Sequence, residues 1–328
     1  MRKFLLLCGL PLFACATTTT ASVPASAPAG ASALHRVQRV EVAEGVELEL
    51  LDFGGQGPAL VFLTGRGNTG HVFDDFAPEF TRAYHVYSVT RRGYGSSSWP
   101  EQGYDTATLS TDVVRVLDSQ GIAKAVLVGH SLAGEEITWL ATHHPERVEK
   151  VVFLDIQTKG DLAAELYAVL PLPTPREPNP ADVASRATVA AAIARGLGGP
   201  LPEHEIDETV EFDPKTGRYL RDRQWPDADA QLTKSALKVD FAAIQAPVLY
   251  LHTGERPPER AEDYNGFAQM TPAQQEKLRV MTPKAVQRVA EIRSMPGWKI
   301  VQLEHAEHYV WITNRDDVLR EMKAFLGR

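Results

Sequence analysis

The sequence has little cysteine, no excess of basic charge and no long hydrophobic run. It contains two cysteines among 328 residues, Cys8 and Cys15, and both lie close to the N-terminus. The rest of the chain therefore offers no disulfide, no thiolate metal site and no cysteine nucleophile. Acidic residues outnumber basic ones by 42 to 34, and the formal net charge is −8. This balance argues against nucleic acid as a partner, because binding the phosphate backbone requires clustered Lys and Arg.

Two motifs of cofactor-dependent enzymes are also missing. The chain has no His-Glu-x-x-His pattern, and no Gly-x-Gly-x-x-Gly follows the first buried strand. The sequence therefore predicts no catalytic metal and no organic cofactor. Hydrophobic residues make up 44% and charged residues 23%. These proportions are typical of a folded, water-exposed protein rather than of a disordered or polytopic membrane protein.

The first residues have the features of an export signal. Arg2 and Lys3 precede an apolar run over residues 4–13. That run is shorter than the roughly 20 apolar residues needed to span a membrane comfortably. It ends at Leu12-Phe13-Ala14-Cys15, which resembles a lipobox, in which the cysteine becomes the lipidated first residue. Ordinary cleavage after Ala14-Cys15-Ala16 is the alternative.

We therefore expect an exported bacterial protein that is periplasmic or attached to a membrane through a lipidated Cys15. Residues 1–15 would form the signal. Residues 16–36 would form a flexible linker, because the Thr, Ala, Ser, Pro and Gly that dominate this stretch cannot bury a core.

From residue 37 to residue 328, apolar runs alternate with helical patterns, which predicts one α/β domain. Alternation over 37–53 indicates an antiparallel hairpin. Further strands are predicted at 59–63, 86–89, 125–128, 151–154, 247–251 and 299–303, and helices at 71–84, 109–117, 132–143, 283–293 and 317–326. This order predicts a mostly parallel sheet flanked by helices. The Pro- and Ala-rich block over about 157–244, with short helical patches and a small hairpin around 215–217, predicts a mainly helical insertion between two strands.

A serine follows the predicted strand 125–128, within Gly129-His130-Ser131-Leu132-Ala133-Gly134. Here a strand must turn into a helix within about one residue, which forces Ser131 into a strained conformation. Small neighbours leave room for that turn, and the hydroxyl is exposed at the helix N-terminus. Ser131 is therefore the predicted nucleophile, and an ordinary N-cap serine is the alternative.

A serine nucleophile needs a base, and two histidines follow the last predicted strand. His308 lies five residues beyond that strand, just before the final helical stretch. His305 lies nearer the strand tip, where a surface position is expected. We therefore predict that His308 is the base.

The order Ser131 then His308 on this strand pattern resembles the α/β-hydrolase superfamily, most of all its esterase-like members with a small helical cap. Thr64-Gly65-Arg66-Gly67 is similar to the family's His-Gly-x-Gly oxyanion loop. Residues 91–96 are similar to its Asp-x-Arg-Gly-x-Gly-x-Ser turn, with Thr90 in place of the Asp. The resemblance implies a serine esterase without a cofactor, whose oxyanion hole is formed by the backbone N–H groups of Leu132 and Arg66.

The expected triad acid is missing from its usual place. Most family members carry it after the strand predicted at 247–251, but Pro257 stands at that position. Asp155 is the preferred substitute, because some members, such as haloalkane dehalogenases, carry the acid after the preceding strand. Glu255 is the alternative acid, and Glu259 and Asp263 remain open.

The predicted activity is hydrolysis of a small or medium carboxylic ester by acyl transfer. A lactonase, thioesterase, amidase, perhydrolase or carbon–carbon hydrolase would use the same groups, and a non-catalytic ligand-binding protein or a structural envelope lipoprotein are further alternatives. Epoxide hydrolase and dehalogenase chemistry is disfavoured, because those relatives carry Asp where this chain has Ser131. Tyr167, Trp225 and Phe241 of the cap either line a pocket or form cap core, with core favoured for two of them. The natural substrate and the oligomeric state stay open.

Overall fold

The fold is that of a computed structural model, which describes residues 34–156, 179–234, 239–254, 257–264 and 266–327. Cys15, Tyr167 and Glu255 therefore lie outside the described residues. Across the described part of the chain, no helix combines the length and the apolar character needed to cross a bilayer.

An eight-stranded sheet forms the centre of the molecule, in the order β1-β2-β4-β3-β5-β6-β9-β10. The first strand pairs antiparallel with the second, and the second pairs antiparallel with β4, whereas all later neighbours are parallel. This confirms the mostly parallel sheet predicted from the sequence. The strands are β1 (Arg36–Ala43), β2 (Val46–Gly54), β3 (Ala59–Leu63), β4 (His85–Thr90), β5 (Ala125–His130), β6 (Val148–Leu154), β9 (Val248–His252) and β10 (Lys299–Gln302).

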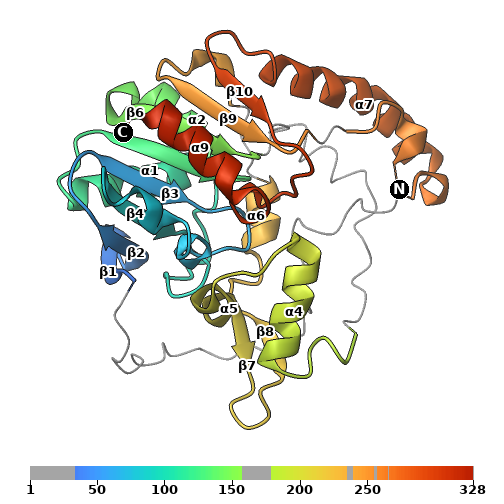
Figure 1. The fold of residues 1–328 in the computed structure, drawn as a ribbon. Coiled ribbons are helices and arrows are strands. Elements are labelled where there is room, and N and C mark those ends of the chain that lie inside the picture. Colours follow the sequence, from blue (N-terminus) through green and yellow to red (C-terminus); the bar gives the residue numbers. More distant parts are fainter. Residues whose placement is uncertain (1–33, 157–178, 235–238, 255–256, 265, 328) are drawn as a thin grey trace.

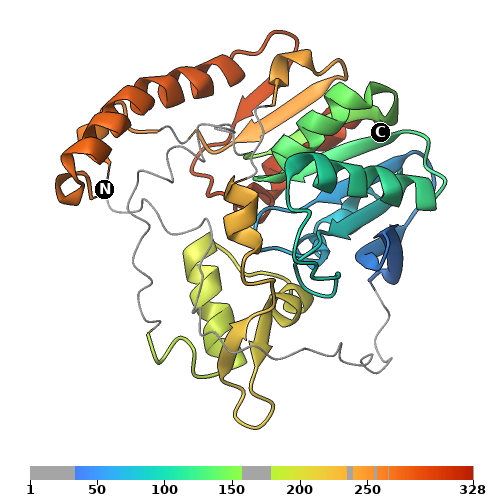
Figure 2. The same ribbon diagram turned by 180° about the vertical axis from the view of Figure 1, so that it is seen from behind.

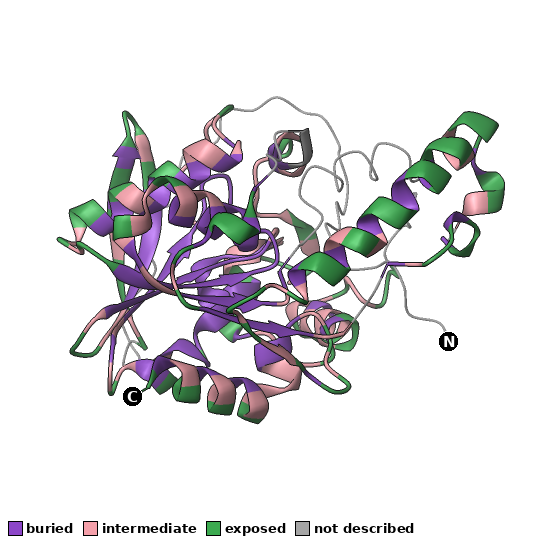
Figure 3. Ribbon diagram, turned by 90° about the horizontal axis from the view of Figure 1, so that it is seen from above, coloured by how far each residue is buried: buried purple, intermediate pink, exposed green. Residues whose placement is uncertain are grey.

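The central strands are buried on both faces, and each face has its own core. Along β3, Val61 and Leu63 enter one cluster, whereas Leu60 and Phe62 enter the other, as the twofold alternation of strand side chains requires. The helices α1 (Thr106–Ser119) and α2 (Ala133–His143) cover the first face, and α9 (Arg315–Leu326) covers the second. Figures 1 and 2 show these helices on opposite sides of the sheet, and Figure 3 shows the buried strands between them.

The insertion between β6 and β9 has most of its described elements at the lower end of Figure 1. It contains a two-stranded hairpin, which confirms the small hairpin predicted around 215–217. Its elements are α4 (Arg186–Leu197), α5 (Glu203–Thr209), β7 (Val210–Phe212), β8 (Tyr219–Asp222) and α6 (Ala228–Lys234).

The helix predicted over 71–84 is wrong in type. The segment instead forms two short 3₁₀ helices, η1 (Gly70–Phe73) and η2 (Ala77–Phe80). Pro78 lies at the start of η2. It has no N–H to donate and disfavours α-helical geometry at the residue before it, which disfavours a continuous α-helix through this point.

The helix predicted over 283–293 begins eleven residues earlier, because α7 spans Pro272–Ile292 and contains Pro283 in its interior. Thr271 and Gln274 form a capping box at its start, and this pattern marks a helix N-terminus. Proline is common in the first turn of a helix, so a pattern that starts at Pro283 does not reveal the turns that precede it. The remaining elements are the short helix α8 (Val310–Thr313) and the 3₁₀ helices η3 (Pro145–Arg147), η4 (Phe241–Ala243), η5 (Ala261–Asp263) and η6 (Phe267–Gln269).

Candidate active site

Ser131 lies in the sharp turn between β5 and α2. Its φ is +51°, a left-handed conformation that is costly for a residue other than glycine. Neighbouring glycines make the close packing of this turn feasible. A Cβ added to Gly129 would lie 2.5 Å from the side chain of Ile137, and one added to Gly134 would lie 2.6 Å from the Cβ of Ile156. The turn therefore has the strained geometry that the sequence pattern predicts for a nucleophile elbow.

Asp155 and His308 are hydrogen-bonded to each other. The Nδ1 atom of His308 lies 2.7 Å from Oδ2 of Asp155. Asp155 directly follows β6, and its φ is +41°. Its other carboxylate oxygen accepts hydrogen bonds from the backbone N–H of Thr253 at 3.0 Å and from the Thr253 hydroxyl at 3.2 Å. Both oxygens of Asp155 are thus engaged, and the carboxylate is held in one orientation against the imidazole.

His130 connects this pair to the elbow. Its ring centroid lies 4.5 Å from that of His308, and its Nε2 lies 3.2 Å from the backbone carbonyl oxygen of His308. Since His130 directly precedes Ser131, this contact brings the histidine loop to the serine turn. Complete burial, together with the charge of a protonated His308, lowers the pKa of His130 well below its usual value. His130 is therefore neutral, and its ring packs against the ring of His308.

The other candidates are not part of this arrangement. His305 is exposed in the same loop as His308. Asp263 is exposed and pairs with Arg260 at 3.0 Å, and Glu259 is exposed. Among the described carboxylates considered for the triad, Asp155 is the one that contacts His308.

The loop after β3 packs against the serine turn. A Cβ added to Gly65 would lie 3.2 Å from the Cβ of Ser131 and 2.7 Å from Nδ1 of His130. This glycine therefore allows the backbone to approach Ser131 closely. Leu132, the other residue expected to provide an oxyanion N–H, is the N-cap residue of α2 and directly follows Ser131.

Arg91 holds the loop after β3 in place through hydrogen bonds, a role that the sequence did not reveal. Its guanidinium donates hydrogen bonds to the carbonyl oxygens of Thr64 at 2.8 Å and Gly65 at 3.2 Å. In a trans peptide the C=O and N–H groups point in opposite directions. The bond to the Gly65 carbonyl therefore fixes the direction of the Arg66 N–H, on the side of the loop away from Arg91.

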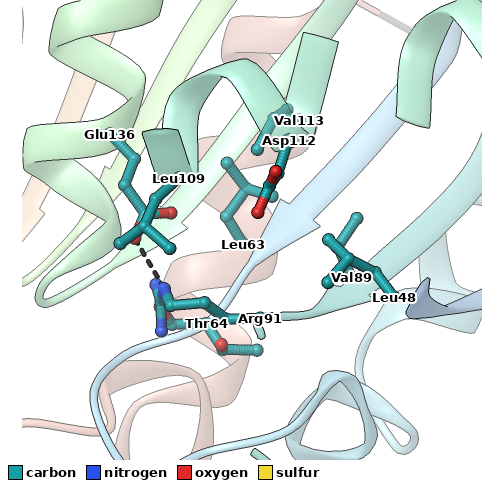
Figure 4. Close-up of a pocket in the computed structure, with 9 residues that line it drawn as sticks. All are labelled: Leu48, Leu63, Thr64, Val89, Arg91, Leu109, Asp112, Val113 and Glu136. Carbon is teal, nitrogen blue, oxygen red and sulfur yellow. Dashed lines mark hydrogen bonds and ion pairs between the residues drawn. The ribbon is translucent and has the colours of Figure 1, made fainter. Parts of the chain in front are cut away.

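Arg91 also forms a buried ion pair with Glu136 of α2, at 2.6 Å (Figure 4). Burial raises the pKa of the Glu136 carboxyl, and the Arg91 charge opposes that rise. A small pocket lies around this pair and does not include Ser131, Asp155 or His308. Its lining residues are Leu48, Leu63, Thr64, Val89, Arg91, Leu109, Asp112, Val113 and Glu136.

The cap contacts the turn after β4. The backbone N–H of Trp225 donates to the carbonyl oxygen of Gly93 at 2.7 Å, and the Tyr94 hydroxyl donates to Asp229 at 2.9 Å. Trp225 packs against an apolar cluster that includes Leu132, next to Ser131. Phe241, by contrast, is buried in the core on the α1 and α2 face of the sheet. Of the two described aromatics named in the sequence analysis, Trp225 is therefore the one beside the candidate site.

The comparisons with known proteins agree with this fold. Residues 58–270 match the protein family described as alpha/beta hydrolase fold, and the chain belongs to that family.

Curated relatives align over part of their length. The chain is 34% identical over 118 residues to 3-oxoadipate enol-lactonase 2 of Acinetobacter baylyi, covering 36% of this chain and 44% of that protein. It is 30% identical over 101 residues to 2-(acetamidomethylene)succinate hydrolase of Mesorhizobium japonicum, covering 31% and 36%. It is 34% identical over 124 residues to epoxide hydrolase A of Mycobacterium tuberculosis, covering 36% and 38%. The matches thus span less than half the length of each of these relatives.

Solved structures match over a larger part of the chain. E-2-(acetamidomethylene)succinate hydrolase superposes with a TM-score of 0.62 and 20% identity, over 90% of this chain and 100% of that one. The enol-lactonase of Burkholderia xenovorans superposes with a TM-score of 0.56 and 18% identity, over 88% and 100%. At such identities these likenesses establish the fold alone.

Proposed function

We propose that the protein is a serine hydrolase that cleaves carboxylic esters by acyl transfer. The observation that carries this proposal is the hydrogen bond between His308 and Asp155, at a loop that contacts the strained turn of Ser131. A carboxylate on Nδ1 holds the imidazole in the tautomer whose Nε2 can accept a proton. Nucleophile, base and acid then have the roles of a catalytic triad.

The reaction would proceed in two halves. As the Ser131 oxygen attacks the ester carbonyl, its proton passes to Nε2 of His308, and the imidazolium is stabilised by Asp155. The negative charge on the carbonyl oxygen is held by the N–H groups of Leu132 and Arg66. His308 then gives the proton to the leaving alcohol, and a water molecule cleaves the acyl-enzyme by the same steps in reverse order.

A serine nucleophile also favours one of the reactions that the relatives catalyse over the others. A serine oxygen that opened an epoxide or displaced a halide would form an ether, which water does not cleave under these conditions. A serine that attacks an ester forms another ester, which water can hydrolyse with the help of the same base. Ser131 therefore favours acyl substrates for this chain, although one of its relatives is an epoxide hydrolase.

A cyclic ester is the second candidate substrate. The similarity to 3-oxoadipate enol-lactonase 2 supports it. Lactone opening requires the same attack and the same oxyanion donors, with the leaving alcohol remaining attached to the acyl group.

The test combines turnover with covalent labelling. Purified protein should hydrolyse short p-nitrophenyl esters or simple lactones, and a fluorophosphonate probe should label one serine. The Ser131→Ala variant should lose both properties while its circular dichroism stays unchanged, whereas Ser110→Ala in α1 should keep both. Labelling of the Ser131→Ala variant at the wild-type rate would refute the nucleophile, and absence of turnover and labelling in the wild type would favour a ligand-binding protein.

We also propose that the chain is exported and lipidated at Cys15. Arg2, Lys3 and the apolar run that ends at this cysteine support the proposal. Expression in a bacterium fed a clickable fatty acid should label the wild-type protein in the membrane fraction. The Cys15→Ser variant should be unlabelled, and equal labelling of both forms would refute lipidation at this residue.

A further inference from the structure

Four side chains that commonly bind metals meet at one point outside the candidate active site. His35 precedes β1, His71 lies in η1, Asp74 directly follows η1, and His204 belongs to α5 of the cap. Their ligand atoms all lie within 4.8 Å of one another. Asp74 is at the centre, with the ring nitrogens of His204, His71 and His35 at 2.9, 3.1 and 3.2 Å from its carboxylate oxygens.

The cluster is largely buried and incompletely hydrogen-bonded. The side chains of His35 and Asp74 are 6% and 1% exposed. Neither ring nitrogen of His35, nor Oδ1 of Asp74, makes a hydrogen bond with any described residue, although Nε2 and Oδ1 lie 3.2 Å apart. Unsatisfied buried polar atoms are costly and rare in native proteins. A single bound cation would accept a lone pair from one ring nitrogen of His35 and another from Oδ1 of Asp74.

Neighbouring residues orient two of the rings. His71 presents Nδ1 to Asp74, while its Nε2 faces Oε1 of Glu49 at 3.7 Å. The second oxygen of Glu49 accepts a hydrogen bond from Thr90 at 2.7 Å. A carboxylate behind the histidine is the usual support of an imidazole that binds a metal. His35 packs edge-on against Phe53, with ring centroids 5.1 Å apart.

We propose that His35, His71, Asp74 and His204 bind one divalent transition-metal ion, for which Zn²⁺ is the best fit. Three imidazoles and one carboxylate match the ligand preference of zinc. Ligands about 2 Å from a tetrahedral ion lie about 3.3 Å apart. On binding, the most distant of these ligand atoms, which lie within 4.8 Å of one another, would therefore draw together, whereas the nitrogen of His204, at 2.9 Å from Asp74, would move slightly away from the carboxylate. His204, whose side chain is 57% exposed, has room for most of that movement.

Four protein ligands would close the coordination sphere, as in structural zinc sites. The ion would join three parts of the chain that are far apart in sequence: the segment before β1, the segment after the loop of residues 64–67, and the cap. Next to His204, Glu205 already accepts hydrogen bonds from Asn68 and Thr69 of the second segment. The metal would therefore fasten α5 to the residues that follow the oxyanion loop, independently of the chemistry at Ser131.

Zinc titration of the chelator-treated, tag-free protein by calorimetry tests this proposal. We expect one ion per chain and a melting temperature several degrees higher with Zn²⁺ than without, because a ligand that binds only the folded state stabilises it. His204→Ala and His35→Ala should each weaken binding by at least about tenfold. His204 is exposed, so its variant is expected to fold, and its circular dichroism without metal should match that of the wild type.

Two controls separate this site from adventitious binding. His144→Ala removes a partly exposed histidine at the end of α2 and should leave affinity and stoichiometry unchanged. Co²⁺ in place of Zn²⁺ should give the strong visible absorption of a tetrahedral site in the wild type, and this absorption should be lost in His204→Ala. A wild type that binds no zinc at micromolar concentrations, or equal affinity in the wild type, His35→Ala and His204→Ala, would overturn the proposal.

Discussion

Removing the Arg91 guanidinium should separate the stability of the protein from the positioning of its oxyanion loop. Arg91 makes a 2.6 Å ion pair with Glu136 and donates to two carbonyl oxygens of the loop after β3. In Arg91→Met the buried Glu136 loses its partner. We expect a loss of about 3–5 kcal/mol in the free energy of unfolding, because breaking one side of a buried ion pair leaves an uncompensated charge.

A second substitution should recover much of that stability. In Arg91→Met/Glu136→Leu no charge is left unpaired, and apolar replacements of buried ion pairs are often neutral or stabilising. The carbonyl oxygens of Thr64 and Gly65 still lose their donor, however, so the loop is held less firmly. We therefore expect the double variant to be more stable than the single variant, but to have a kcat about 10- to 100-fold below wild type, because oxyanion donors act only when precisely placed.

Urea unfolding and steady-state hydrolysis of a p-nitrophenyl ester measure the two quantities on the same samples. Glu136→Gln is the matched control, because it removes the charge but leaves the bonds from Arg91 to the loop. It should keep kcat within a few-fold of wild type. A double variant with wild-type kcat would show that Arg91 does not position the oxyanion loop.

Three further outcomes are expected. Asp155→Asn should lower kcat by about 10³- to 10⁴-fold, because the imidazole of His308 loses the partner that holds its tautomer; a change below tenfold would reassign the acid. The fall of kcat/KM on the acid side should follow a single proton, because burial lowers the pKa of His130 well below its usual value and keeps this ring neutral; a two-proton slope in the pH profile would contradict this. Gly65→Ala should lower kcat by about tenfold or more at similar KM, because the new methyl group would lie 3.2 Å from the Cβ of Ser131; stopped-flow measurement of acylation checks this, and wild-type acylation would show that the loop does not approach the serine as described.

Much of the fold could be predicted from the sequence, because the strands of a doubly covered sheet are continuous apolar runs. The runs at 59–63 and 125–128 correspond closely to β3 and β5. The errors occurred where proline dominates the local signal. Pro78 interrupts an apparently helical pattern, whereas Pro283 is accommodated within α7. The difference depends on packing that a linear pattern does not contain.

The candidate site was only partly predictable for a similar reason. Ser131, Asp155 and His308 each follow a predicted strand, and the carboxyl ends of parallel strands share one edge of the sheet. Thr253 follows a strand too, but only the structure shows that its N–H and hydroxyl orient Asp155. The cluster around Asp74 has no compact motif, since His35 and His204 come from opposite halves of the chain.

The pairing of β5 with β6 fixes where Ser131 and Asp155 lie relative to each other. His130 is paired with Leu154 in the sheet, so Ser131 and Asp155 directly follow two adjoining strands. Both residues have positive φ. The spacing of these two groups is thus set by the backbone pairing of two central strands. His308, carried by a connecting segment, is the member of the trio whose placement should suffer first on warming or on mild denaturation.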